Sequence, residues 1–258
     1  MAGSTFDINC DMGEGFGNWR LSEDEAILPL ISTANLACGF HAGDPVIMMD
    51  TVAQAKANGV AVGAHPGLPD LLGFGRRVIA VSPQDLYAYV AYQVGALSGF
   101  LRAEGLPMNH VKPHGAMFHV LRDPALSQAT LDAIAATAPG AAVYWAGPTG
   151  REIFTAQAAQ RGMRVCAEAY PDLNYTNDGS LILERKKQAV EPEVIYHRMV
   201  EIITEQTLTN QEGTRLPMNV ESVCIHGDGP NAIAVIEAAR RAIADCGRRV
   251  GCATAIAH

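Results

Sequence analysis

The stretch TANLACGFHAGDP, residues 33–45, decides the predicted fold. Its small and apolar residues suit a buried strand that Gly39 ends, and His41 follows in the turn. Asp44 and Pro45 then form a helix start, because the Asp carboxylate accepts hydrogen bonds from free backbone N–H groups and proline needs no partner there. His41 is therefore expected at the carboxyl end of a strand, the edge at which α/β proteins bind ligands and carry out chemistry.

Strands and helices alternate along the whole chain. The predicted strands are residues 6–10, 33–38, 60–64, 110–112, 142–145, 164–167 and 220–225. The predicted helices are residues 22–31, 44–58, 82–104, 123–138, 150–161, 193–205 and 231–246. A capping box of Ser22 and Glu25 opens the first of them. Each helix is a crossover connection, so the seven strands are expected to form a parallel sheet.

Two segments stand outside this alternation. Residues 170–192 form a polar excursion that contains a charge run at 184–187, which is most simply a solvated face. The tail from residue 247 carries no clear signal.

Polar side chains follow six of the predicted strands directly. They are Asp11, His41, His65, His114, Glu168 and His226. If the strands are parallel, all six lie at one edge of the sheet. An open sheet would spread them along that edge, whereas a closed barrel would arrange them around one cavity. The sequence therefore favours an α/β barrel, and we expect residues 1–258 to form a single domain.

Composition limits the partners of this chain of 258 residues. The formal net charge of −8 disfavours non-specific binding to nucleic acids or anionic membranes and leaves small molecules and other proteins. No apolar run is long enough to span a membrane, and no signal peptide is recognised. The six cysteines lack a C-x-x-C spacing and are interpreted as buried small residues in a reducing compartment, so we expect a cytoplasmic protein. Homo-oligomerisation is left open.

Histidine and aspartate side chains that converge from separate strands have two chemical interpretations. They can bind a divalent metal such as zinc with an open position for water, whose pKa the metal lowers. The first ligand set to consider is Asp11, His41 and His65, with His114 as a spare. Alternatively, the same groups act as general acids and bases, with Glu14 or Asp228 among them.

Three cations need an explanation. Lys112 stands at the end of an apolar strand, where a buried ammonium requires a partner. It could pair with a carboxylate substrate, stabilise an oxyanion or form a structural ion pair. Arg76 and Arg77 belong to a long irregular loop and suit a carboxylate or phosphate, although a solvated pair fits the pattern equally well.

Six ordered blocks of the sequence resemble the signature of the LamB/YcsF family. They are DINCDMGEGFG at 7–17, ANLACGFHAGDP at 34–45, GAHPG at 63–67, GFGRR at 73–77, VKPHGA at 111–116 and HGD at 226–228. The resemblance spans nearly the whole chain, so the six blocks together are far more specific than any one of them.

The family comprises the A subunits of bacterial ATP-dependent 5-oxoprolinases, so the resemblance implies both a fold and an activity. The implied fold is a (β/α)7-type barrel similar to the polysaccharide deacetylase and glycoside hydrolase group. The implied activity is hydrolysis of the 5-oxo-L-proline lactam to L-glutamate, coupled to ATP hydrolysis, in a complex with B and C subunits. The chain has no Gly-x-x-x-x-Gly-Lys-Ser/Thr loop, so ATP, the co-substrate, is expected to be bound largely by the partners.

The resemblance also implies roles for individual residues. Asp11, His41 and His65 stand at the centre of the predicted site, as metal ligands or as acid and base groups. The further catalytic residues are expected to be Glu14, Lys112, His114 and Asp228, and the substrate-binding residues Asn9, Arg76, Arg77, Glu168 and His226.

The chain departs from the family pattern in its later part. Leu173 stands where the family usually has arginine, and Arg185 falls about one residue late after the Asp-Gly pair. Two other functions stay open. One is a stand-alone metal-dependent deacetylase or amidase that acts on an N-acyl sugar or a small amide. The other is a non-catalytic subunit that binds a small lactam or stabilises its partners.

Overall fold

The computed structural model describes residues 4–182 and 188–254. The predicted charge run at 184–187, including Arg185, lies outside the described residues.

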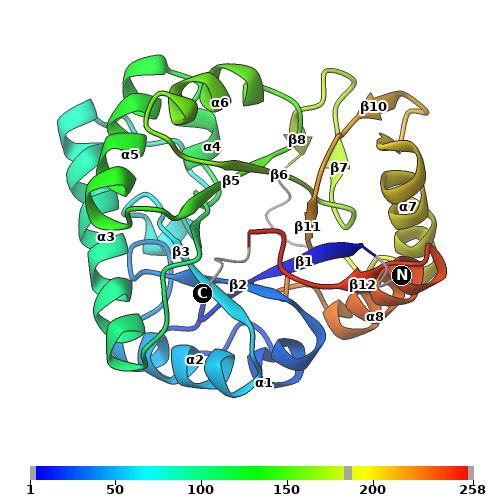
Figure 1. The fold of residues 1–258 in the computed structure, drawn as a ribbon, viewed down its shortest axis with the longest axis horizontal. Coiled ribbons are helices and arrows are strands. Elements are labelled where there is room, and N and C mark those ends of the chain that lie inside the picture. Colours follow the sequence, from blue (N-terminus) through cyan, green and yellow to red (C-terminus); the bar gives the residue numbers. More distant parts are fainter. Residues whose placement is uncertain (1–3, 183–187, 255–258) are drawn as a thin grey trace.

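Seven parallel strands close into a barrel (Figure 1). They are β1 (Thr5–Met12), β2 (Thr33–Ala37), β3 (Ala61–His65), β4 (His110–Val111), β5 (Ala142–Ala146), β6 (Val165–Ala169) and β11 (Ser222–Cys224). Each strand pairs with the next in this order, and β11 pairs with β1 through Asp7 beside Ser222 and Asn9 beside Cys224. The closure confirms the predicted seven-stranded (β/α) barrel.

Helices surround the barrel as crossover connections (Figure 1). The longer ones are α2 (Pro45–Ala57), α3 (Pro83–Ala103), α5 (Pro124–Thr137), α6 (Arg151–Ala159), α7 (Pro192–Glu205) and α8 (Ala232–Asp245). The predicted starts of three of them are confirmed, because the side chains of Asp44, Ser82 and Asp123 accept from backbone N–H groups of the first turn. Each is followed by proline at the first helical position, where no donor is needed.

The helix predicted over residues 22–31 is wrong in length and in its cap. The structure has one turn, α1 (Asp24–Ile27), followed by the 3₁₀ helix η1 (Leu28–Leu30). Pro29 explains the early end, because it lacks an N–H group and its ring clashes with the preceding turn. Ser22 does not cap the helix. Its hydroxyl hydrogen-bonds Asp24, whose carboxylate also accepts from the N–H of Gly13 at 2.8 Å and so fixes the loop after β1.

Several short elements were not predicted. The tail forms β12 (Arg249–Val250), which pairs with Thr5 and Phe6 of β1. Two hairpins lie outside the barrel, one of β7 (Asn174–Tyr175) and β8 (Leu181–Ile182), the other of β9 (Thr207–Thr209) and β10 (Arg215–Pro217). Further single turns are η2 (Leu71–Gly73) and α4 (Met117–Val120). Elements of two to four residues are too short to show a period in the sequence.

The buried positions agree with the apolar pattern. The core includes Cys10, Cys38, Cys166 and Cys224, as the sequence predicts, but Cys246 and Cys252 are only partly buried. All six cysteines are free. Within residues 4–182 and 188–254, none of the helices is long and apolar enough to cross a membrane.

Candidate active site

The carboxyl ends of the strands bring the predicted polar residues together. Asp11 and His65 belong to β1 and β3, and Glu14, His41 and His114 lie in the loops that follow β1, β2 and β4. All five are buried. They converge because the strands are parallel and the barrel is closed.

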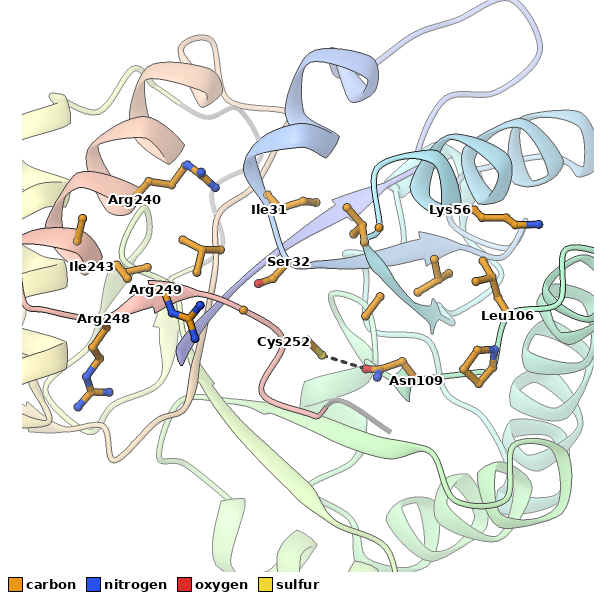
Figure 2. A pocket seen from close by; sticks show the side chains of 18 residues that line it. Ile31, Ser32, Lys56, Leu106, Asn109, Arg240, Ile243, Arg248, Arg249 and Cys252 are labelled. Atoms are coloured by element: carbon orange, nitrogen blue, oxygen red, sulfur yellow. Dashed lines mark hydrogen bonds between the residues drawn. The ribbon is translucent and has the colours of Figure 1, made fainter. Parts of the chain in front are cut away.

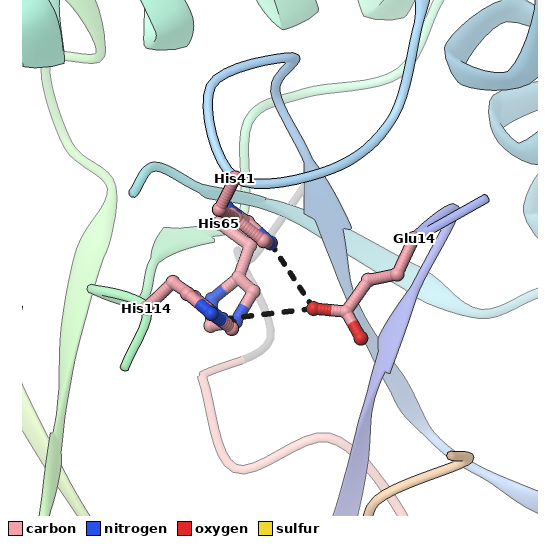
Figure 3. A group of neighbouring side chains, drawn as sticks. All are labelled: Glu14, His41, His65 and His114. Atoms are coloured by element: carbon pink, nitrogen blue, oxygen red, sulfur yellow. Dashed lines mark hydrogen bonds and ion pairs between the residues drawn. The ribbon is translucent and has the colours of Figure 1, made fainter. Parts of the chain in front are cut away.

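Glu14, His41, His65 and His114 form a compact cluster, here called the histidine cluster (Figure 3). Glu14 Oε1 lies 3.1 Å from His41 Nε2 and 3.6 Å from His114 Nδ1. The rings of His41 and His114 are stacked, with their centroids 3.6 Å apart. One potential ligand atom from each residue lies within 4.8 Å of the others.

Two backbone carbonyls fix the tautomers of the cluster. His65 Nδ1 donates to the carbonyl of Lys112 at 2.7 Å, and His114 Nε2 donates to the carbonyl of Phe74 at 2.8 Å. A carbonyl can only accept, so both of these nitrogens carry a hydrogen. The other two ring nitrogens, His65 Nε2 and His114 Nδ1, face each other at 2.9 Å. In neutral rings both would present lone pairs, so this contact requires a proton or a cation.

Burial sets the charge of the cluster. Desolvation, together with the neighbouring histidines, holds the pKa of His41 and of His114 well below the usual value. Both rings are therefore neutral near pH 7, the form in which histidine binds metals. Desolvation and then the charge of Asp11 raise the pKa of Glu14 to about 8, so this carboxyl can give or take a proton near neutral pH.

The cluster fits a divalent cation. Three imidazoles and one carboxylate are a donor set typical of zinc and related metals. The carbonyls behind His65 and His114 act as the outer partners that orient histidine ligands. The buried Nδ1 of His41 has no hydrogen-bond partner among the described residues. The structure thus groups Glu14 with the histidines, whereas the sequence put Asp11 in the ligand set.

Asp11 lies beside the histidine cluster and belongs to a polar chain inside the barrel. Its Oδ2 is 3.3 Å from His65 Nε2, and its Oδ1 accepts from Lys112 Nζ at 2.9 Å. Burial opposes ionisation of Asp11, but His65 and Lys112 outweigh it and hold its pKa well below the usual value. Glu168 lies 3.6 Å from the same ammonium and accepts from Asn9 Nδ2 at 2.9 Å. Lys112 is therefore a fully buried counter-ion between two carboxylates.

The remaining predicted residues lie at the rim of the site or outside it. Arg76 pairs with Asp228 at 3.2 Å and lines the cavity beside the cluster. His226 Nδ1 contacts Asp172 at 2.9 Å, and its Nε2 is 3.8 Å from Asp11. Arg77 does not line this cavity. Its guanidinium pairs with buried Asp70, and its side chain is 65% exposed.

Sequence reasoning missed several residues that support the site. They are Asn35, His110, Tyr170, Asp172 and Cys224, together with the carbonyl of Phe74. Asn35 was detectable, because an amide in an apolar strand needs buried partners. It donates to Asp11 at 2.8 Å and to Asn9 at 2.7 Å. The carbonyl of Phe74 has no signal in the sequence, since every residue has one.

Cavity size alone does not identify the site. A cavity of about 770 Å³ lies at the opposite end of the barrel (Figure 2), beside Ser32, Asn109 and β12. None of the described residues that line it is acidic or a histidine. The cavity at the histidine cluster is smaller, about 90 Å³, but it is lined by Asp11, Glu14, His65 and His114. The chemistry therefore favours the smaller cavity.

The fold and the site define a class, a parallel β/α barrel with a buried histidine and carboxylate centre at the carboxyl ends of its strands. The model of the LamB/YcsF family matches residues 6–258, and the chain belongs to this family. The resemblance seen in the six sequence blocks is thus confirmed.

Curated relatives cover nearly the whole chain. A protein of Clostridium beijerinckii, named as the A subunit of 5-oxoprolinase, is 44% identical over 90% of this chain and 91% of its own length. A protein of Emericella nidulans named lactam utilization protein lamB is 41% identical over 95% and 96%. The crystal structure of a lactam utilization protein from Thermus thermophilus superposes with a TM-score of 0.86 at 41% identity, covering 96% of this chain and 99% of that one.

Proposed function

We propose that this chain is the A subunit of an ATP-dependent 5-oxoprolinase, which opens the lactam of 5-oxo-L-proline to give L-glutamate. The observation that carries the proposal is the 41–45% identity, over about nine-tenths of each chain, to proteins named for 5-oxoprolinase or for lactam utilization. The buried acid and base groups of the histidine cluster supply chemistry suited to hydrolysis.

The proposed reaction requires activation of the amide. A planar, unstrained lactam is a poor electrophile, and transfer of a phosphoryl group from ATP to its oxygen would turn that oxygen into a leaving group. Water would then add to the activated carbon, and the bond from this carbon to the ring nitrogen would break, which opens the ring and leaves an acyl phosphate. A second water would hydrolyse the acyl phosphate to the carboxylate of L-glutamate and inorganic phosphate. The names of the relatives imply further subunits, and we expect the B and C subunits to bind most of the ATP. The six free cysteines suit a reducing compartment such as the cytoplasm.

Glu14 is the best candidate for the proton transfers of this reaction. Its carboxyl borders the cavity, and its pKa of about 8 lets it exist in both protonation states near neutral pH. It could take a proton from the attacking water or give one to the ring nitrogen. Lys112 does not line this cavity, and in this proposal it keeps Asp11 ionised beside His65. Arg76, held by Asp228, could contact an anionic group of the substrate.

A divalent metal is compatible with the same site. Glu14, His41, His65 and His114 would hold it. When bound, such an ion lowers the pKa of a water ligand and so supplies a nucleophile near neutral pH.

The second candidate function is a stand-alone metal-dependent amidase, and the ligand-like arrangement of the histidine cluster favours it. It predicts about one metal ion per chain and turnover without ATP. The small cavity of about 90 Å³ suits a small amide better than an N-acyl sugar.

Glutamate release from 5-oxo-L-proline tests these functions. It should be measured with and without ATP, for this chain alone and mixed with its B and C partners. Release that needs both ATP and partners would support the proposal, and release by this chain alone without ATP would favour the amidase. No release in any mixture, with the partners shown to be active, would overturn the oxoprolinase assignment.

A pair of variants tests the site in the same assay. Glu14→Gln removes the titrating carboxyl and should abolish most of the release, whereas Glu25→Gln changes an exposed carboxyl of α1 and should not. Full activity of Glu14→Gln would show that Glu14 transfers no proton. If both His41→Ala and His65→Ala also kept full turnover, the chain would be a non-catalytic subunit.

A further inference from the structure

The cavity beside the histidine cluster has a second wall that the proposed chemistry does not use. This wall is formed by α4 and the turn after it, by the end of β5, and by the hairpin of β7 and β8. Its residues include Phe118, Arg122, Trp145, Ser180 and Leu181. Arg122 supplies the positive charge of this wall, and Arg76 lies on the opposite side with Asp228.

Arg122 differs from the other cations at this end of the barrel. Arg76 and Lys112 each pair with a carboxylate, at 3.2 Å and 2.9 Å. The hydrogen bond of the Arg122 side chain goes to a neutral group instead, from Nη2 to Ser180 Oγ at 3.3 Å. Within residues 4–182 and 188–254, it forms no ion pair. A guanidinium has five N–H donors in a planar fork that matches a carboxylate, so most of this fork is available to a ligand.

The hairpin positions Ser180 for this contact. The Ser180 hydroxyl donates its hydrogen to Asp178 Oδ2 at 3.2 Å, so its oxygen accepts from Arg122. Asp178 itself accepts from the hydroxyl of Thr176 and from the N–H of Ser180, and these hydrogen bonds hold its pKa below the usual value. The carboxylate of Asp178 is thus engaged by the hairpin, one hydroxyl away from the guanidinium.

Much of the rest of the wall is apolar, although His119 of α4 and Thr149 also line it. Trp145 packs edge-to-face on Phe118 at 5.5 Å between centroids, and buried Leu173 lies on the same cavity. Such a surface suits the two methylene groups of a small ring. Arg122 itself is exposed, so its guanidinium stands at the outer edge of this surface.

We propose that Arg122, oriented by Ser180, binds the carboxylate of the substrate while the amide faces Glu14 and the histidine cluster. This inference rests on the proposed function and names the substrate class of that site as a small lactam that carries a carboxylate. In 5-oxo-L-proline the carboxylate and the amide carbonyl stand on opposite sides of the ring nitrogen. The substrate can therefore present its carboxylate to one wall of the cavity and its amide to the other.

Steady-state kinetics of the complete assembly with 5-oxo-L-proline and ATP test this inference. Arg122→Gln should raise KM for 5-oxo-L-proline about 10- to 100-fold, the effect of one charged hydrogen-bonded contact. The value of kcat should change by less than about threefold, because the reacting groups stay in place. Arg122→Lys keeps the charge but not the planar fork, so its KM should lie between those of the unaltered chain and Arg122→Gln. Arg102→Gln removes an exposed cation at the end of α3 and is the matched control.

The outcomes separate this inference from the proposed function. An unchanged KM in Arg122→Gln, with full activity of the unaltered chain, would overturn the role of Arg122 alone. A fall in kcat at constant KM would also overturn it, since that result indicates a structural or chemical effect. No turnover by the unaltered chain would overturn the proposed function and this carboxylate assignment with it. If Arg122→Gln does not fold, Arg122→Lys and Ser180→Ala decide, and both should raise KM by several-fold.

Discussion

His65 Nε2 and His114 Nδ1 lie 2.9 Å apart, and the opposite nitrogen of each ring donates to a backbone carbonyl. Two neutral imidazoles held in this way repel each other through their lone pairs, so the pair needs a positive charge between or beside them. A shared proton would supply it, with Asp11 at 3.3 Å from His65 as counter-ion. A divalent cation held also by Glu14 and His41 would supply it equally well.

The first prediction is that the chain binds about one divalent metal ion, measured by elemental analysis after equilibration with zinc and removal of the excess. Loss of an outer partner that orients a histidine ligand lowers metal affinity roughly 10- to 100-fold. His114→Gln removes a ligand itself, so it should lower the affinity for zinc by more than that. His197→Gln, on the exposed face of α7, is the control and should keep the metal. If the chain binds no metal, a proton shared between His65 and His114 is left to explain the short contact between their nitrogens.

The second prediction concerns the buried charge of Lys112. Lys112→Met leaves Asp11 and Glu168 buried without their cation, so we expect a loss of about 3–5 kcal/mol in the free energy of unfolding. Lys56→Met breaks an exposed pair with Glu104, whose members are 48% and 39% exposed, and should cost about 0–1 kcal/mol. Urea denaturation of both variants measures the difference. Equal costs would contradict the role of Lys112 as a buried counter-ion.

Local signals in the sequence were sufficient for much of the fold. Asp44 and Asp123 cap helices through their own side chains and the following proline, so a few neighbouring residues determine these boundaries. His41 and His65 were expected to converge because the carboxyl ends of parallel strands meet in a closed barrel. These predictions did not depend on any distant contact.

The membership of the histidine cluster could not be predicted in the same way. Gly13 has φ of +67°, a conformation that favours glycine, and its N–H is held by Asp24. This turn brings Glu14, rather than Asp11, into the cluster. Phe74 also has a positive φ of 54°, and its carbonyl accepts from His114. Both effects depend on loop geometry, and the contact of Arg122 with Ser180 likewise depends on where the hairpin of β7 and β8 lies.

The third prediction concerns Gly67, which lies against His41. A Cβ atom at this position would stand 2.5 Å from His41 Nδ1, and Gln93 fixes the Gly67 backbone through two hydrogen bonds of 2.9 Å. Because the backbone is held, Gly67→Ala should displace the His41 ring. We expect a loss of roughly 1–3 kcal/mol in stability from this overpacking. Glutamate release by the assembly should fall strongly.

Gly95→Ala is the control for this substitution. Gly95 lies within α3, and a Cβ there would meet nothing within 4 Å. Alanine should therefore stabilise the helix by up to about 1 kcal/mol and leave glutamate release unchanged. If Gly67→Ala released glutamate at the same rate as Gly95→Ala, the position of His41 would not matter for the reaction.

The fourth prediction is a pH-dependent contribution of Asp44. Its carboxylate accepts from the N–H groups of Ile47, Gly17 and Val46, and these hydrogen bonds hold its pKa below the usual 3.8. A carboxyl whose pKa is lowered by folding stabilises the folded state above the pKa of the unfolded chain. This contribution is lost as the pH falls through the folded pKa. Asp44→Ala should therefore destabilise the protein by about 0.5–2 kcal/mol at pH 7, and by progressively less below about pH 4.

Denaturation of the unaltered chain and of Asp44→Ala at several pH values between 7 and 3 measures this difference. Asp50→Ala, an exposed carboxyl of the same helix, is the control and should show a difference within about 0.5 kcal/mol at every pH. A difference for Asp44→Ala that stays constant down to pH 3 would mean that the neutral carboxyl caps α2 as well as the charged one. In that case the stability of the α2 start, and of the His41 turn before it, would not depend on the charge of Asp44.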